Sequence, residues 1–319
     1  RLINEQNDNF ARDFIKEVGV GIGLLGAGNL IVPDISAQEK DYDVKSVATP
    51  VIDVHTHLPP NVDLERIIEN FDRGGVEKAV VMARGGMSAE DTLHFYKKYP
   101  NRVVPFIPFQ VKGWIKQEPH FLQDVEHKLK SGNFKGMGEV ILRHYSVPQM
   151  GAGDFDIPAD GYMMLEIMKF AAKYNAPVLV HMEAESGTIT KFEKALNYEP
   201  NAKVILGHAG RATPEAIERL LSQYPNLYCD TAALDRTRPY GVEKNPISDE
   251  SNMLRKEWVT LFTKFSDRFM LGIDGVFPPH YNNFAYVKAV MAQRELLAQL
   301  NPEVAKKIAY DNAKKLLKV

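Results

Sequence analysis

The sequence has almost no cysteine, almost no net charge and no apolar run as long as the ~20 residues of a membrane-spanning helix. Its one cysteine, Cys229, cannot form a disulfide within the chain, which excludes a fold held together by disulfides. Lysine and arginine number 39 against 41 aspartate and glutamate, and the formal charge of -2 provides no basic field for nucleic acid. We therefore expect no nucleic-acid partner.

What is present is the composition of a globular protein with a large core: 319 residues, 45% hydrophobic and 25% charged. After residue 50, apolar β-branched runs alternate with amphipathic segments, as in repeated βα units around a parallel sheet. We count eight runs, which predicts an α/β fold with a single (β/α)8 TIM barrel over residues 51–319. The predicted strands are residues 51–57, 78–84, 102–110, 134–142, 177–183, 203–210, 227–233 and 269–275. The predicted helices include residues 62–71, 90–99, 161–174, 215–224 and 253–265.

The first predicted strand carries the sequence Asp53-Val54-His55-Thr56-His57 at its end. Side chains of a strand alternate between its two faces, so we expect Asp53, His55 and His57 to point the same way. Imidazole nitrogens with a carboxylate suit a divalent cation such as Zn²⁺. The alternative is that both histidines lie on the polar side of a half-buried strand.

Other predicted strands also end in possible metal ligands, and a TIM barrel places its chemistry at these ends. Strand four reaches Glu139, strand five ends in His181, strand six in His208 and strand eight in Asp274. Any one histidine in an apolar strand is usually a hydrogen-bonded core residue. A buried carboxylate such as Asp274, however, costs several kcal/mol unless a cation or a full set of donors accompanies it. A shared metal site that includes both strand-one histidines would satisfy all six groups.

These residues together resemble the amidohydrolase superfamily of metal-dependent hydrolases, and within it the amidohydrolase-2 branch, over roughly residues 50–319. The end of the chain, residues 302–317, also resembles the terminal helix of that branch. The resemblance implies one or two divalent ions, with Zn²⁺ favoured, bound by the six residues above. Many members carry a carboxylated lysine between two metals on strand four, where this chain has Glu139, so the number of metals stays open.

The activity implied by the resemblance is hydrolysis, in which a metal-activated water cleaves a C–O or C–N bond of a small, acidic lactone, ester or amide. Asp274 would serve as the general base. His208 would be either a ligand of a second metal or a donor to the oxyanion. A metal-dependent, non-oxidative decarboxylase is one alternative, although such relatives generally lack a carboxylate at the position of Glu139. A non-catalytic exported binding protein on a barrel scaffold is the other.

Candidate substrate-binding residues follow the predicted strands, because loops on a rigid scaffold carry specificity. Arg84 ends strand two, Arg143 and His144 follow strand four, and Arg236 and Arg238 follow strand seven. A guanidinium at these positions would bind a substrate carboxylate through two parallel hydrogen bonds. Solvation at the surface is the alternative for at least one of these arginines. The partner we expect is thus a small molecule, and a homo-oligomer remains possible.

The first fifty residues differ in kind from the barrel. Residues 18–33 carry no charge, are rich in glycine and aliphatic side chains, and follow Arg12 and Lys16. Residues 35–37 resemble a small-residue cleavage site, and residues 11–16 resemble a twin-arginine leader with Ala11 in place of the first arginine. The G-x-G-x-x-G pattern at residues 21–26 lacks the βαβ unit of a dinucleotide site. We expect an export signal at 1–37, a linker at 38–50 and a periplasmic or extracytoplasmic location, with an uncleaved anchor or an ordinary apolar extension as the alternatives.

Overall fold

The computed structural model describes residues 49–145, 153–235 and 245–319. The predicted leader, nearly all of the predicted linker, and the candidates Arg236 and Arg238 lie outside these residues. Within the described ranges, no helix has the length and apolarity needed to cross a membrane.

Eight parallel strands form a nearly closed barrel, which confirms the TIM-barrel prediction. Neighbouring strands follow the order of the chain, and the short β5 (Phe155–Asp156) pairs antiparallel with β4. Backbone N–H groups of Val54 and His57 donate to the carbonyls of Leu271 and Gly275 at 3.0 and 2.9 Å, which joins the last strand to the first. The barrel strands are β1 (Val51–Leu58), β2 (Val76–Ala83), β3 (Val103–Ile107), β4 (Gly136–His144), β6 (Val178–Met182), β7 (Val204–Leu206), β8 (Leu227–Asp230) and β9 (Phe269–Met270).

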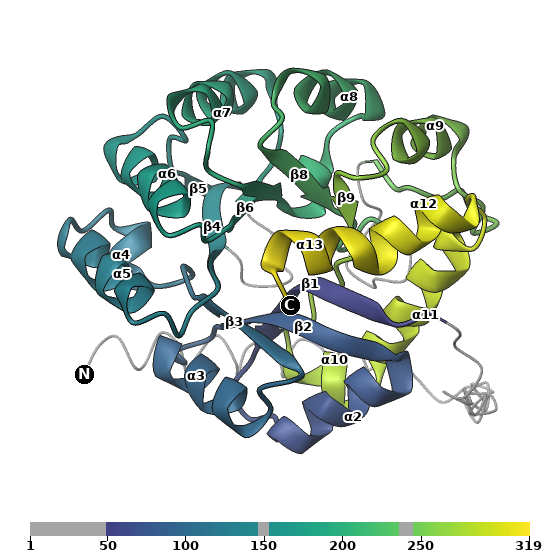
Figure 1. Cartoon of the computed structure of the whole chain (residues 1–319), viewed down its shortest axis with the longest axis horizontal. Helices are drawn as coiled ribbons and strands as arrows, with labels where there is room; N and C mark the ends of the chain where they lie inside the picture. The colour runs from purple at the N-terminus through teal and green to yellow at the C-terminus, as the bar shows by residue number, and fades with distance from the viewer. Residues whose placement is uncertain (1–48, 146–152, 236–244) are drawn as a thin grey trace, which may run out of the picture.

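Helices surround the strands as an outer ring, and the C-terminal helix lies across one end of the barrel (Figure 1). The ring consists of α2 (Leu64–Gly74), α3 (Ala89–Lys98), α4 (Lys112–Ile115), α5 (His120–Lys130), α6 (Tyr162–Lys173), α7 (Ser186–Tyr198), α8 (Pro214–Gln223) and α9 (Lys256–Lys264). After β9 come α10 (Pro278–Asn282), α11 (Ala285–Leu297), α12 (Pro302–Lys306), η4 (Lys307–Asp311) and α13 (Asn312–Leu317). Local sequence sets several boundaries: Ser88 and Asp91 form a capping box at α3, and Gly75 ends α2 in the left-handed conformation.

The core has two parts, one inside the barrel and one between the barrel and the helices. Inside the barrel, side chains such as Ile52, Val80 and Phe106 pack together with Ala313 and Leu317 of α13. The larger cluster fills the space between strands and helices. The C-terminal helix therefore closes the end of the barrel at which the strands begin, and leaves the other end for the site.

Four predicted strands end at least three residues earlier than expected: β3 at Ile107, β7 at Leu206, β8 at Asp230 and β9 at Met270. Strand β7 stops at Leu206, and a 3-10 helix η3 (Gly207–Arg211) follows, in which His208 has a left-handed backbone with φ of 56°. Strand β9 stops at Met270, although residues up to Gly275 still bond to β1. The apolar runs predicted the strand positions correctly, but a run of apolar residues also continues into tight turns where side chains stay buried.

Candidate metal centre

Six side chains from five strands or the turns after them meet at the C-terminal end of the barrel. They are the six predicted ligands His55, His57, Glu139, His181, His208 and Asp274, and each is at most 9% exposed. The structure thus brings all six of these residues together.

Glu139 lies at the centre of this group, between two sets of histidines. Its Oε1 is 3.4 Å from both His55 Nε2 and His208 Nε2, and 2.9 Å from His181 Nδ1. Its Oε2 is 3.5 Å from His57 Nε2 and accepts a hydrogen bond from Gln110 Nε2 at 2.6 Å. One carboxylate therefore faces all four histidines at once.

Asp274 completes the set on the β1 side of Glu139. Its Oδ1 lies 3.3 Å from His57 Nε2 and 3.7 Å from His55 Nε2. The described residues contain three groups of potential ligand atoms, each within 4.8 Å of one another: His55 with His57 and Asp274, Glu139 with His181 and His208, and His55 with His208 and Asp230.

The spacing and the hydrogen bonding of these atoms fit a metal ion. Two ligands each about 2.1 Å from an ion at a tetrahedral angle lie about 3.4 Å apart. All but one of the distances given above between a histidine nitrogen and a carboxylate oxygen lie between 3.3 and 3.7 Å. Among the described buried side chains, His55 Nε2 and both ring nitrogens of His57 have no hydrogen-bond partner. Buried polar atoms without partners are rare, so these unpartnered nitrogens fit the binding of a cation.

The charges of the cluster point the same way. Burial disfavours a charged His181, but Glu139 raises the pKa of this histidine to about 9. Burial likewise opposes the charge on Glu139, yet His55 and His181 hold the pKa of this carboxyl well below its usual range. The cluster thus creates a negative field in which positive charge is stabilised, whether as protons on histidine or as a bound cation.

Asp230, at the end of β8, is a site residue that the sequence reasoning missed. Its Oδ2 is 2.9 Å from His55 Nδ1, and its Oδ1 accepts hydrogen bonds from the backbone N–H of His208 and Ala232 at 2.8 and 3.0 Å. A carboxylate in this position holds a ligating histidine in one orientation and tautomer. The sequence carried part of the signal, since Asp230 is a carboxylate within the seventh predicted strand, but that strand was predicted to run to residue 233, so Asp230 was not placed at a strand end.

Asp53 does not share the direction of His55 and His57, contrary to the expectation from strand alternation. Its Oδ1 accepts from the backbone N–H of His55 and Ile273 at 2.9 and 3.0 Å, and its Oδ2 accepts from Tyr286 of α11 at 2.7 Å. The pairing of β1 with β2 shifts register between Asp53 and Thr56. This irregularity reverses the alternation, so Asp53 faces the helices while both histidines face the barrel mouth.

Among the candidate substrate-binding residues, Arg143 and His144 lie beside the cluster at the end of β4. The Arg143 guanidinium donates to the carboxylate of Asp154 and to the carbonyl of Phe155, which ties it to the β5 hairpin. The ring of His144 lies 5.0 Å from the ring of His181, and its Nδ1 is 3.1 Å from the Gly153 carbonyl. The Arg143 guanidinium therefore already has partners within the protein, whereas His144 lies next to the site.

Arg84 directly follows β2, two strands away from β4 in the barrel, and is half-buried. Its guanidinium carbon is 5.1 Å from the centre of the Phe277 ring, and the charges of Asp274 and Glu139 act on it. It is thus placed next to the cluster.

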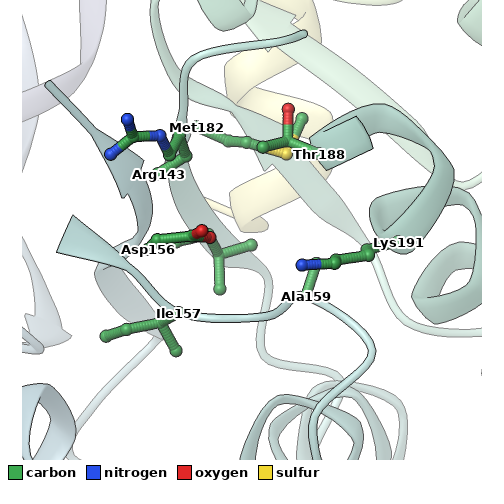
Figure 2. A pocket seen from close by; sticks show the side chains of 8 residues that line it. Arg143, Asp156, Ile157, Ala159, Met182, Thr188 and Lys191 are labelled. Atoms are coloured by element: carbon green, nitrogen blue, oxygen red, sulfur yellow. The ribbon is translucent and has the colours of Figure 1, made fainter. Parts of the chain in front are cut away.

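A small pocket opens beside the cluster, between the β4–β5 hairpin and α7 (Figure 2). Asp156 and Lys191 face it from opposite sides, and none of the six clustered residues lines it. Its lining consists of Leu142, Arg143, Asp156, Ile157, Ala159, Met182, Thr188 and Lys191.

Solved structures share this fold at low sequence identity. An uncharacterised TIM-barrel protein from Bordetella bronchiseptica is 16% identical with a TM-score of 0.61, over 84% of this chain and 98% of its own. A dihydroxybenzoic acid decarboxylase from Polaromonas sp. JS666, with bound manganese and the inhibitor 2-nitroresorcinol, is 13% identical with a TM-score of 0.56, over 85% and 97%. A dihydroorotase from Saccharomyces cerevisiae is 15% identical with a TM-score of 0.57, over 85% and 84%.

The sequence itself matches a family model, and no curated protein matches it. The matching model is described as amidohydrolase and covers residues 52–319, which is the whole barrel with all six clustered side chains. The chain therefore belongs to the amidohydrolase family of metal-dependent enzymes.

Proposed function

We propose that this enzyme is a metal-dependent hydrolase that cleaves a C–O or C–N bond of a small lactone, ester or amide. The observation that supports this proposal is the position of Glu139, whose two oxygens face histidines on both sides. A carboxylate placed in this way suits a bridge between two ions, and two-metal sites are common in hydrolases.

In this proposal, one ion would be held by His55, His57 and Asp274, and a second by His181 and His208, with Glu139 shared between them. Such ions polarise a carbonyl oxygen and lower the pKa of water, which makes water an effective nucleophile at neutral pH. We favour Zn²⁺, because imidazole and carboxylate ligands suit it. Elemental analysis of the purified protein tests both the identity and the number of ions.

The protein side chains would supply the proton transfer. Asp274 would orient the attacking water, take its proton on the carboxylate and pass it to the leaving group. His208 fits the role of ligand better than that of oxyanion donor, because its Nδ1 is 2.9 Å from the Ala232 carbonyl and so carries the proton. Its Nε2, which faces Glu139, then has a lone pair and no proton to donate.

Decarboxylation is the competing activity, since a decarboxylase shares the fold. Glu139 favours hydrolysis, because the decarboxylases that the sequence resembles generally have no carboxylate at this place. A screen of lactones, esters and amides for hydrolysis, beside aromatic and dienoic acids for CO₂ release, decides between them. Hydrolysis that depends on metal supports the proposal, and CO₂ release without hydrolysis contradicts it. Metal binding with neither reaction would favour a binding protein.

The Asp274→Asn variant tests the assigned base once a substrate is known. We expect it to keep its metal and to lose turnover by about 10²-fold or more, because three or more ligands remain while the base is gone. His55→Ala, by contrast, should lose metal as well. Near-normal turnover of Asp274→Asn would remove this residue from the catalytic role.

A further inference from the structure

Arg84 differs from the other arginines of the described residues in that its guanidinium has neither a hydrogen-bond partner nor an ion-pair partner. The others bond to carboxylates or backbone carbonyls: Arg102 donates to Asp72, for example, and Arg294 to the carbonyl of Gly75. Within the described part of the chain, the Arg84 guanidinium makes neither a hydrogen bond nor an ion pair; only its backbone N–H is bonded, to the Leu58 carbonyl. Its donors are therefore available to a ligand.

The position of Arg84 is fixed by its surroundings and not by its own hydrogen bonds. Gly85 and Gly86 follow it with φ of 64° and 89°, a left-handed turn that ends β2 at this point. The Phe277 ring lies 5.1 Å from the guanidinium carbon. An aromatic ring attracts a guanidinium and restrains it, while the N–H donors in the plane of the group stay accessible.

The charges around Arg84 favour the binding of an anion to its guanidinium. Burial lowers the pKa of Arg84, and the nearby negative charges of Asp274 and Glu139 act in the opposite direction. If these two carboxylates hold metal ions, their charge is offset and no longer stabilises the guanidinium. A half-buried cation then lies at the mouth, and its guanidinium N–H donors are not among the fully buried polar atoms, so an anionic ligand can reach them from solvent.

We propose that Arg84 receives a carboxylate of the substrate, so that the enzyme acts on small carboxylic acids whose scissile bond lies over the metal cluster. This inference rests on the proposed function, since it names the substrate class of that site. Planar carboxylates match the fork of a guanidinium through two parallel hydrogen bonds, which is why we assign a carboxylate.

Binding of simple carboxylates to the metal-loaded, full-length protein tests this inference without turnover. The probes are benzoate and glutarate, each compared by calorimetry with a neutral alcohol that cannot be hydrolysed, benzyl alcohol or 1,5-pentanediol. The variants are Arg84→Met and Arg84→Lys. Arg66→Met is the matched control, because Arg66 is also half-buried and lies 5.1 Å from a phenylalanine ring, that of Phe284, but is paired with Glu69.

We expect the unaltered protein and the Arg66→Met control to bind at least one carboxylate about tenfold or more tightly than its alcohol. Arg84→Met should lose this preference while keeping its metal content, and Arg84→Lys should keep part of it, because lysine retains the charge without the fork.

Equal affinities for carboxylate and alcohol in the unaltered protein overturn the inference. So does an unchanged carboxylate affinity in Arg84→Met, since the metal alone would then explain binding. Either failure leaves the hydrolase proposal standing, because that depends on the reaction screen.

Discussion

His55 presents its Nε2 to Glu139 and Asp274 because Asp230 holds its other nitrogen. The buried Asp230 carboxylate accepts the Nδ1 proton of His55, so the lone pair of the neutral ring, the form that binds a metal, lies on Nε2. The same carboxylate bonds to the backbone N–H of His208, whose left-handed conformation it helps to fix. One residue without direct contact to the proposed metal thus positions two of its ligands.

Asp230→Asn should weaken metal binding about 10- to 100-fold. The backbone N–H groups of His208 and Ala232 require an oxygen opposite them, so the new amide would turn its NH₂ group toward His55 Nδ1. That donor forces the His55 proton onto Nε2, the nitrogen that faces the cluster. Competition with a metal-binding dye measures the affinity.

The control for this variant is Asp235→Asn, which changes a buried carboxylate that accepts from Gln293 Nε2 at 2.9 Å and belongs to none of the metal-ligand groups. It should bind metal as the unaltered protein does. A loss of affinity in both variants, or in neither, would contradict a special role for Asp230.

At the residue scale, the sequence was enough to predict the site residues that follow from a single structural rule. His55, His57, Glu139, His181 and Asp274 all follow apolar runs, and parallel strands of a barrel end at the same mouth. Partners of these residues were harder to find. Nothing in the sequence says which strand-end carboxylate approaches a histidine ring, because that depends on register between distant strands.

At the scale of secondary-structure elements, irregular strand pairing determines in which direction the side chains of the site point. The β1–β2 ladder shifts register between Asp53 and Thr56, and the β4–β6 ladder shifts between Met137 and Val140, beside Glu139. Such irregularities redirect side chains and are frequent near active sites. Strict alternation predicted the wrong direction for Asp53 for this reason. A sequence pattern shows that side chains alternate with a period of two, but it does not show at which residue the alternation is interrupted.

Helices α10 and α11 form hydrogen bonds to β1, the strand that pairs with the last strand of the barrel. Tyr281 donates to the His57 carbonyl at 2.8 Å, and Tyr286 donates to Asp53 at 2.7 Å. Both tyrosines are fully buried or nearly so. These helices therefore stabilise the strands that carry His55, His57 and Asp274.

Tyr286→Phe should lower the free energy of unfolding by about 1–3 kcal/mol, since the buried Asp53 carboxylate loses a donor while packing is kept. Urea denaturation followed by circular dichroism measures the change. Tyr162→Phe, at a position where the side chain is 67% exposed, should stay within about 0.5 kcal/mol of the unaltered protein. Equal stability of Tyr286→Phe and the control would show that the Asp53 contact contributes little.

For the whole molecule, the sequence predicted the barrel because eight apolar runs in alternation with helices leave few other folds. It did not predict that α13 packs its Ala313 and Leu317 into the barrel interior. A short amphipathic helix can pack against the outside or the end of a barrel, and only the shape of the assembled core decides between them.

We propose that the protein is exported and that the segment up to about Ala37 is removed, because residues 18–33 carry no charge and a polar stretch follows them. Mass spectrometry of the protein recovered from its native host should find a mature N-terminus close to Gln38, in an extracytoplasmic fraction. A mature species in the cytosol that retains Phe14 would contradict the proposal.

Removal of metal should destabilise the entire barrel, because the cluster joins β1, β4, β6 and the turns after β7 and β9. A ligand at about 100 times its dissociation constant stabilises the folded state by about 2.7 kcal/mol. For a domain of this size, each kcal/mol shifts Tm by about 2–4 °C, so chelation should lower Tm by about 5–10 °C. Differential scanning calorimetry before and after dialysis against a chelator measures the shift, and added Zn²⁺ should reverse it.

Asp230→Asn, with its weaker affinity, should show a smaller shift at the same Zn²⁺ concentration. An unchanged Tm on full metal removal, verified by elemental analysis, would mean that the six side chains are held in place by the barrel alone.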